Sequence, residues 1–356
     1  MKLGVLVNYA SEFHTAAAEV VDLERHGIDV VAVPEAYSFD AVSLLGYLAA
    51  ATRDVVLTSS IMQIYSRTPT LTAMTAAGLD YVSGGRFELG IGASGPQVVE
   101  GFHGVAYDAP LGRTEEIIEI CRAVWRREKL TYSGKHYSIP LPEGKGTGLG
   151  KPLALINHPL RERIPISIAS IGPKNVELTA RVADGWQPIF FHPTRSREVW
   201  GEALERGTEQ RSTELAPLKV NVQLPVAIGD DTDAALAHTR AHFALYIGGM
   251  GARGQNFYHK LACQYGFQAD ADRVQNLYLA GRKAEAAEAV PEQLVRDMSL
   301  IGTEKHIAAQ LDALDAAGVS TLYLLPVDDS PNGRIGAVEA VRDILSARAK
   351  TEAHGY

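Results

Sequence analysis

The chain has 356 residues, of which 46% are hydrophobic and 21% are charged. These proportions are typical of globular proteins and exclude collagen-like, coiled-coil and wholly disordered chains. Thirty-four Lys and Arg residues against 42 Asp and Glu residues give a formal net charge of -8. We therefore expect no nucleic-acid partner and no attraction to an anionic membrane.

The two cysteines, Cys121 and Cys263, show no CxxC or Cys/His spacing. They predict neither a disulfide framework nor a zinc site. The apolar run at residues 3–7 is too short for a secretory signal, and no uncharged apolar stretch is long enough to span a bilayer. These features predict a cytoplasmic protein without a bound metal ion.

Eight short runs rich in β-branched residues alternate with longer stretches that have helical apolar spacing. The runs cover residues 3–7, 30–34, 55–62, 86–92, 165–170, 185–190, 220–228 and 321–327. Most of them are almost continuously apolar, as expected for parallel strands that are covered on both faces. The alternation predicts βα units, and eight of them predict a single (β/α)8 TIM barrel over residues 1–356.

Two segments exceed the minimal βα repeat. Residues 130–163 are rich in glycine and turn residues, and we interpret them as an insertion after the fourth strand. Residues 237–297 are rich in Ala, Arg and Glu, and they predict an added helical region after the seventh strand. In a barrel of this type both segments would line the substrate pocket, but neither contains a motif that identifies a substrate.

The predicted carboxyl ends of the strands are where such barrels bind their ligands. Here these ends are small and polar, as at residues 58–63, 90–95 and 169–173. Small residues let the backbone approach a flat ring or a phosphate, and hydroxyl and amide groups can bond to the edge of a ring.

The fourth strand ends in Gly90-x-Gly92-x-x-Gly95, a literal GxGxxG sequence. A dinucleotide fingerprint normally belongs to the first βαβ unit, with its acidic partner at the end of the second strand. Here three predicted strands come first, and Glu115 lies at the start of a helix. We interpret the sequence as a glycine-rich loop that approaches another kind of ligand.

Two further strand ends are candidate ligand sites. Gly172-Pro173 precedes the helical stretch 176–183, where free backbone amides could bind a phosphate. An ordinary turn with proline at the first helical position explains the same residues, and both interpretations stay open. Glu35 directly follows an apolar strand, which favours a functional role. The eleven histidines are scattered, and no Ser/His/Asp arrangement stands out.

Residues 85–104, 172–180 and 183–186 resemble the bacterial luciferase-like family. The likeness is greatest to the branch that uses the deazaflavin coenzyme F420, and the string SGPQVVEG and Asn256-Phe257-Tyr258 contribute to it. The resemblance covers most of the chain. It implies a TIM barrel with insertions and F420 as the cofactor.

The resemblance also implies roles for individual residues. The third strand of the family commonly ends in a non-prolyl cis peptide, which would fall at Ser60-Ile61, with Ile61 behind the central ring of the cofactor. Glu35 matches an acidic position near the ring's polar edge, and residues 169–172 match a phosphate-binding segment. The implied cofactor-binding residues are Glu35, Ser60, Ile61, Gly92, Ser94, Gly95, Ala169, Ser170, Ile171, Gly172 and Gln187.

The sequence departs from the sugar-phosphate and alcohol dehydrogenases of this branch. They carry a His directly after the acid of strand two and a Glu near the end of strand four, where this chain has Ala36 and Gly95. The pattern is more similar to methylenetetrahydromethanopterin-reductase-like members, in which reduced deazaflavin gives a hydride to a C=C, C=N or C=O bond. The candidate catalytic residues are Tyr9, Gln63, His192 and Tyr258, and His259 is a further candidate proton donor.

Two alternative functions stay open. An FMN-dependent monooxygenase would share the fold and use oxygen, which deazaflavin does not activate because a carbon replaces the reactive ring nitrogen. A non-catalytic binding barrel would also share the fold. Lys174, Arg67 and Arg195 lie in predicted loops that could hold an acidic cofactor tail, or they could simply be solvated. Relatives often pair through barrel helices, so we expect a homodimer and a small-molecule substrate.

Overall fold

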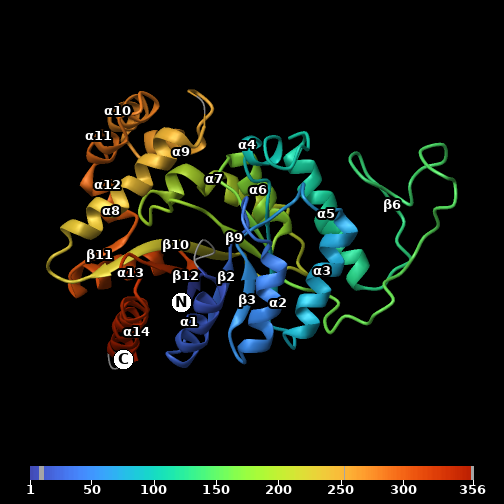
Figure 1. Cartoon of the computed structure of the whole chain (residues 1–356), viewed down its shortest axis with the longest axis horizontal. Coiled ribbons are helices and arrows are strands. Elements are labelled where there is room, and N and C mark those ends of the chain that lie inside the picture. Colours follow the sequence, from blue (N-terminus) through green and yellow to red (C-terminus); the bar gives the residue numbers. More distant parts are fainter. Residues whose placement is uncertain (8–11, 252, 354–356) are drawn as a thin grey trace.

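The computed structural model describes residues 1–7, 12–251 and 253–353, and it describes side chains up to residue 348. Eight parallel strands form a closed ring, which confirms the predicted TIM barrel (Figure 1). In ring order they are β1 (Lys2–Leu6), β2 (Val30–Val33), β3 (Val56–Ser59) with its continuation β4 (Met62–Gln63), β5 (Phe87–Gly92), β8 (Ile166–Ala169), β9 (Gly185–Gln187), β10 (Lys219–Ile228) and β12 (Val319–Pro326). Every one of the predicted apolar runs contains or overlaps one of these strands.

The helices cover the outside of the ring, in the order that βα units require. They are α1 (Phe13–Arg25), α2 (Ala41–Ala51), α3 (Pro69–Val82), the short α4 (Pro96–Val99), α5 (Pro110–Trp125), α6 (Pro173–Val182), α7 (Ser196–Glu209), α8 (Asp233–Ala244), α13 (Glu304–Ala316) and α14 (Pro331–Ala353). Several begin at side-chain caps: Asp40, Thr68 and Thr303 each accept a hydrogen bond from a backbone amide in the first turn. The short strand β11 (Leu300–Gly302) pairs with the end of β10 outside the ring and has no counterpart among the predicted runs.

Three buried tryptophans connect neighbouring elements of the barrel through hydrogen bonds from their indole N–H groups. Trp125, Trp186 and Trp200 are fully buried, and their indole N–H groups donate to the carbonyl oxygens of Ala73, Ser170 and Ile171 at 2.8–3.0 Å. Burial of an aromatic ring is strongly favourable when its polar atom is also satisfied. Trp125 thereby joins α5 to α3, Trp186 joins β9 to the end of β8, and Trp200 joins α7 to the loop after β8.

The insertion after the fourth strand lies away from the barrel. It contains a small hairpin, β6 (Tyr132–Ser133) and β7 (Ser138–Ile139), and residues 140–160, here called the arm, project outward with little regular structure (Figure 1). Five large aliphatic side chains of the arm are exposed: Leu141, Leu149, Leu153, Ile156 and Leu160. The arm therefore does not line the barrel mouth in this chain, contrary to the expectation for residues 130–163.

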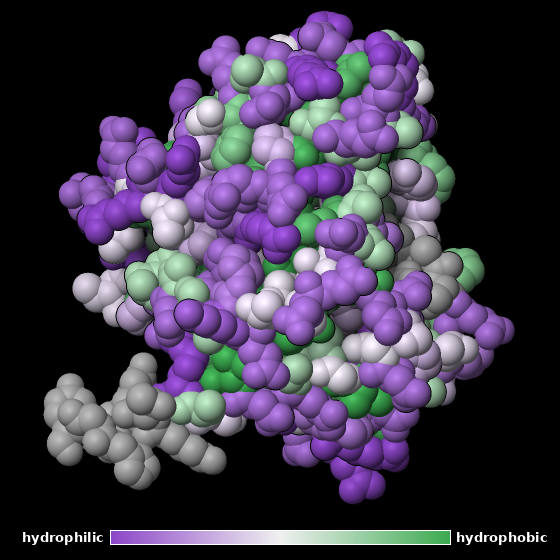
Figure 2. Space-filling model, turned by 90° about the vertical axis from the view of Figure 1, so that its left-hand side faces the viewer, coloured by the Kyte–Doolittle hydropathy of each residue, from purple (hydrophilic) through white to green (hydrophobic). Residues whose placement is uncertain are grey.

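The insertion after the seventh strand is helical. It contains the π-helix η1 (Leu245–Gly249), α9 (Phe257–Gln264), α10 (Gln268–Leu279), α11 (Lys283–Glu288) and α12 (Glu292–Asp297). In Figure 1 these helices lie on the same upper side of the barrel as α4, which follows a strand end. Figure 2, which shows the left-hand side of the view in Figure 1, presents a mainly hydrophilic face with hydrophobic residues in small separate patches. Among the described helices none is long and apolar enough to cross a bilayer.

Candidate active site at the barrel mouth

A break in the third strand of the ring shapes one side of the barrel mouth. The peptide bond Ser60–Ile61 is cis, as the resemblance implied, and it separates β3 from β4. Both pieces pair with β5: Thr58 faces Glu88 before the break, and Gln63 faces Gly92 after it. The two residues of the cis bond therefore lie at the carboxyl end of the ring, where barrel sites form.

The side chain of Ile61 lies across the neighbouring strands. A Cβ atom placed on Gly92 would come within 3.0 Å of Ile61 Cγ1 and 3.4 Å of Ala169 Cβ, so only glycine lets the three residues lie this close. Ile61 and Ala169 keep part of their surface exposed. Three of the predicted cofactor-binding residues thus form one small apolar surface that is open to the mouth.

Two buried amide side chains flank the cis bond. Ser60 Oγ donates to Gln187 Oε1 at 3.0 Å, whereas Gln187 Nε2 is buried without a hydrogen-bond partner. Gln63 donates weakly from Nε2 to the carbonyl of Ala36 at 3.4 Å, and its Oε1 is also buried without a partner. An unsatisfied buried donor or acceptor costs about 1–3 kcal/mol. One buried donor and one buried acceptor therefore remain without a partner beside the cis bond.

Glu35 is not an open carboxylate, because three donors surround it. Arg67 donates to both of its carboxylate oxygens, at 2.6 and 2.8 Å, and the backbone amide of Ala41 donates to Oε2 at 2.9 Å. Both side chains of the pair are mostly buried, at 7% and 12% exposure. The hydrogen bonds from the Arg67 guanidinium to Glu35 raise the pKa of Arg67. The pair is held together, so Arg67 is not free for a cofactor tail.

At the start of α6, Pro173 has no N–H group and the amides of Asn175 and Val176 donate to the Gly172 carbonyl, which leaves the amides of Gly172 and Lys174 for a ligand. Gly172 caps this helix and supplies no side-chain cap, while Asn175 Oδ1 beside it is buried without a partner. Ser170 points the other way: its hydroxyl bonds to Thr179 at 2.8 Å. The predicted phosphate-binding segment therefore offers amides rather than the Ser170 hydroxyl.

The loops after β4 and β5 contribute a pair of packed tyrosine rings, Tyr65 and Tyr107, that was not predicted from the sequence. Ser94 has a positive φ of 58°, and its carbonyl accepts a weak hydrogen bond from the Tyr107 hydroxyl at 3.4 Å. The Tyr107 ring packs against Tyr65 with 5.3 Å between the centroids. Gly95 begins α4. Nothing in the local sequence around either tyrosine indicates this pairing, because they belong to different strand ends.

Among the predicted catalytic residues, Tyr258 faces an aromatic cluster. Its ring lies 4.9 Å from that of Tyr246 and 5.9 Å from that of Phe190, and Phe190 follows β9 with a positive φ of 53°. Burial raises the pKa of Tyr258, so its hydroxyl remains protonated at neutral pH. Tyr9 lies outside the described residues.

His192 and His259 make other contacts. His192 Nε2 lies 3.3 Å from Asp297 Oδ2 at the end of α12, and its ring packs against Tyr265. Burial lowers the pKa of His192 and outweighs the opposing effect of Asp297. His259 pairs with Asp272. Among the described residues, neither histidine side chain bonds to another predicted site residue. Arg195 is also engaged, because it donates to the carbonyl of Tyr265.

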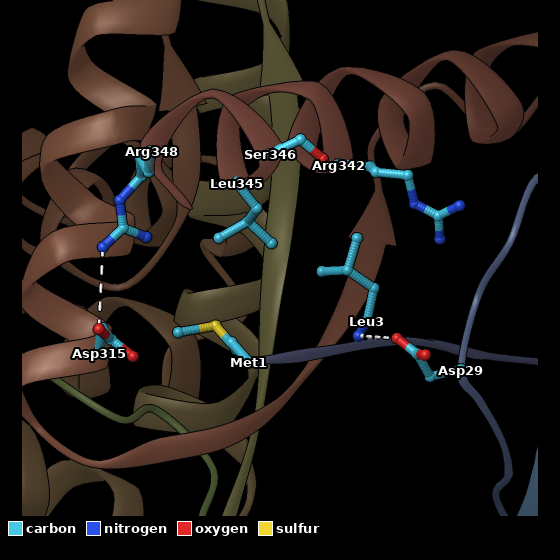
Figure 3. Close-up of a pocket in the computed structure, with 8 residues that line it drawn as sticks. All are labelled: Met1, Leu3, Asp29, Asp315, Arg342, Leu345, Ser346 and Arg348. Carbon is cyan, nitrogen blue, oxygen red and sulfur yellow. Dashed lines mark hydrogen bonds and ion pairs between the residues drawn. The ribbon is translucent and has the colours of Figure 1, made fainter. Parts of the chain in front are cut away.

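A cavity of about 370 Å³ lies at the opposite end of the barrel, between β1 and α14 (Figure 3). Its charged side chains already have partners. Asp29 accepts from the Leu3 amide at 2.8 Å, Arg342 donates to the His26 carbonyl, and Arg348 pairs with Asp312 and Asp315. Polar residues at the amino ends of barrel strands generally serve stability, and these contacts fit that role.

The family model described as luciferase-like monooxygenase matches residues 1–321. A provisionally named coenzyme F420-dependent oxidoreductase of Mycobacterium tuberculosis, Rv3520c, is 41% identical over 97% of this chain and 98% of its own length. The 5,10-methylenetetrahydromethanopterin reductase of Archaeoglobus fulgidus is 26% identical over 90% and 92%. The F420-dependent tetrahydromethanopterin reductase of Methanopyrus kandleri superposes with a TM-score of 0.79 over 96% of each chain, at 20% identity.

Proposed function

Because the chain belongs to the luciferase-like monooxygenase family, and full-length relatives are named as F420-dependent enzymes, we propose that it is an F420-dependent oxidoreductase. It transfers a hydride between the deazaflavin and an electrophilic C=C, C=N or C=O bond of a small organic substrate. The observation that carries this proposal is the pair of unsatisfied amide groups, Gln63 Oε1 and Gln187 Nε2, on either side of the cis bond.

The residues at the mouth fit a flat, polar-edged ring. Ile61, Gly92 and Ala169 provide an apolar surface on which such a ring can lie. The Gln63 oxygen can accept a hydrogen bond from a ring N–H group, and the Gln187 nitrogen can donate one to a ring carbonyl. The deazaflavin supplies the hydride, and the protein supplies its placement.

The first turn of α6 fits the phosphate of the cofactor. Backbone amides at a helix N-terminus favour an anion, and the glycine cap supplies no side chain that would cover the amides of Gly172 and Lys174. Gly172 has open space on its outer side, since the nearest atom to an added Cβ would be Phe257 Cε1 at 3.9 Å. A phosphate can therefore approach the backbone closely there.

Tyr258 is the proton donor that the described residues favour. Its hydroxyl stays protonated because burial raises its pKa, and its ring is fixed by Phe190 and Tyr246. A donor held in this way can give a proton to a substrate atom as negative charge develops on it. Glu35 serves this site through Arg67, because the ion pair orders the loop between β2 and α2.

The test is a parallel fluorescence titration of the purified protein with oxidised F420 and with FMN. We expect F420 to bind more tightly, and Gln63→Leu to weaken it about tenfold, the effect of one lost hydrogen bond of about 1.4 kcal/mol. Gly172→Asp should also weaken it, since the added carboxylate repels a phosphate. Gln210→Leu, an exposed glutamine on α7's far end, is the matched control.

Two outcomes contradict the proposal. Preference for FMN would assign the protein to oxygen chemistry, as in the monooxygenases that give the family its name. Binding of neither cofactor would favour a non-catalytic barrel. A separate result bears on Tyr258 alone. If Tyr258→Phe is as active as the unchanged protein, Tyr258 is not the proton donor, and the proposal that the protein uses F420 still stands.

We also propose that two copies of this chain pair through the outer faces of α2 and α3. Asp80 is the only charged residue in these two helices, and it is buried. The large exposed side chains of the face are Tyr47, Leu71, Met74, Tyr81 and Val82. Exposed apolar side chains on helices without an exposed charge can mark an interaction site, and a two-fold axis would place these helices against themselves.

Sedimentation velocity tests this pairing. We expect a dimer for the unchanged protein and a folded monomer for Met74→Glu, because the added charge would be buried without a partner. Glu209→Gln, at the exposed end of α7, is the control and should remain dimeric. A monomeric unchanged protein, or a Met74→Glu variant that stays dimeric, would contradict this interface.

A further inference from the structure

Three chemically reactive side chains meet in the helical region, outside the barrel mouth. Cys263 Sγ lies 3.7 Å from His259 Nδ1, and His259 Nε2 lies 3.0 Å from Asp272 Oδ1. His259 and Cys263 are four residues apart on α9, so they share one face of that helix, and Asp272 comes from α10. None of the three is used by the proposed hydride transfer.

The order of these contacts is that of a nucleophile, a base and a group that orients the base. A carboxylate that accepts a hydrogen from Nε2 leaves Nδ1 as the acceptor, and Nδ1 is the atom that faces the thiol. The three side chains form a line through the imidazole ring rather than a cage around one point. No group of three such side chains among the described residues is placed to hold a metal ion.

The other cysteine provides an internal contrast. Cys121 is fully buried, its only hydrogen-bond contact is the carbonyl of Pro69 at 3.9 Å, and burial raises its pKa to about 12. Cys263 is partly exposed and has a base beside it. Burial and the Asp272 charge raise the pKa of Cys263, so its reactivity depends on His259 removing the thiol proton.

We propose that Cys263 is a modification site for small disulfides, activated by His259 and oriented by Asp272. His259 Nδ1 takes the thiol proton while the sulfur attacks one sulfur atom of the disulfide. The S–S bond of the reagent breaks, a mixed disulfide with Cys263 forms, and the departing half takes the proton from His259 and leaves as a thiol. The thiol is oxidised and the small disulfide is reduced, so the step balances.

The position of the site couples it to the barrel mouth. The same helix carries Tyr258, which packs on Phe190 and Tyr246, and Phe257, which lies next to Gly172. Because Cys263 contacts His259, which pairs with Asp272 of α10, we expect an adduct on Cys263 to disturb the packing of α9 on α10. This consequence, weaker F420 binding by the modified protein, rests on the proposed function, whereas the modification itself does not.

The experiment follows the native protein with the neutral probe 4,4'-dithiodipyridine, by thiopyridone absorbance and by intact mass. We expect one thiol per chain to react quickly, a second only after denaturation, and none quickly in Cys263→Ser. His259→Gln should slow the fast phase at least tenfold, since a general base contributes about 100-fold or more. Asp272→Asn should slow it, and Asp272→Glu should restore it.

Asp270→Asn, a neighbouring acid on α10, is the matched control, and unchanged circular dichroism and melting temperature show that each variant folds. The proposal is overturned if native Cys263 reacts no faster than the thiols of the denatured protein, or if His259→Gln reacts at the unchanged rate. An F420 titration before and after modification is a separate readout. If no form binds F420, the proposed function fails while the rate and mass data still decide the thiol site.

Discussion

The two insertions of this barrel differ in what their apolar side chains contact. In the helical region after β10, Val274, Leu294 and Val295 are buried to 1% exposure or less. In the arm after β5, Leu149 and Ile156 are 83% and 90% exposed. Both segments belong to one chain and lie on opposite sides of the same barrel (Figure 1), so the difference must come from their own sequences.

Helical periodicity explains this difference. In α10 the apolar residues Ala271 and Val274 lie three positions apart and both are buried, which lets neighbouring helices bury them together. The arm is interrupted by Pro142, Gly146 and Gly150, so no regular element can collect its aliphatic residues on one face. An insertion whose apolar residues recur at helical spacing can form its own core. An insertion without that spacing can bury its apolar residues only against another surface.

The arm is held near its two ends and also along its second half, where the Leu130 amide donates to the Leu153 carbonyl at 3.0 Å and Arg127 donates to the Leu155 carbonyl at 3.2 Å. Near its start, Glu116 of α5 accepts hydrogen bonds from the amides of Lys135, His136 and Tyr137. Just past its end, Arg161 pairs with buried Asp80 of α3. The arm therefore leaves the barrel beside α5 and α3. We expect its exposed leucines to contribute to the proposed dimer, where a second copy can cover them.

The largest expected effect sharpens the contrast between buried and exposed leucines. Leu294→Ala in α12 should lower the free energy of unfolding by about 2–5 kcal/mol, because it removes buried methyl groups and leaves a cavity. Leu153→Ala in the arm, where the side chain is 67% exposed, should change it by less than about 0.5 kcal/mol. Urea unfolding of both variants, monitored by circular dichroism, measures the difference. Equal losses would show that the arm is packed in solution.

A somewhat smaller effect is expected where the arm joins the barrel. Arg161→Ala leaves the fully buried Asp80 carboxylate without its ion pair, which costs about 3–5 kcal/mol in a dry site. Arg161 is itself 33% exposed, so solvent reduces the expected loss to about 2 kcal/mol. The double variant Asp80→Asn/Arg161→Ala, compared by urea unfolding, should recover part of it. No recovery would mean that Arg161 acts by packing alone.

The barrel itself could be predicted from the sequence. Parallel strands covered on both faces are nearly continuous apolar runs, and all the runs became ring strands. β11 was missed because its three residues are too few to show a period. The cis bond at Ser60–Ile61 was implied by the resemblance. The close approach of Ile61 to Gly92 was not predicted, since it depends on strand ends that meet only in the folded ring.

The pairings between distant side chains could not be predicted. Glu35 was correctly placed at the mouth, but nothing in the sequence selects Arg67, 32 residues later, as its partner. The line through Cys263, His259 and Asp272 is a similar case. The spacing of the first two on a helix was visible, whereas the position of Asp272 depends on how α9 packs against α10. The spacing of residues along the sequence predicts which of them share one face of a helix or strand. It does not predict which other element packs against that face.

The smallest expected effect is a loss of stability at low pH. It should also distinguish the helical region from the arm. Burial lowers the pKa of His192, which contacts α12, and of His242 in α8, which packs on Phe190 and Tyr246. The unfolded chain, with a histidine pKa of about 6.5, then binds more protons than the folded chain. The free energy of unfolding must therefore fall as the pH drops below about 6.5, by up to about 1.4 kcal/mol per pH unit for each group.

Urea midpoints measured from pH 7.5 down to 5 test this slope. His242→Phe keeps an aromatic ring in the cluster and removes one titrating group, so its curve should be flatter than that of the unchanged protein. Above pH 7.5 both proteins hold these histidines neutral when folded and unfolded, and their curves should run parallel, whatever the stability of the variant. Equal slopes below pH 6.5 would show that His242 takes up its proton without opening the helical region, and that its burial is not the source of acid sensitivity.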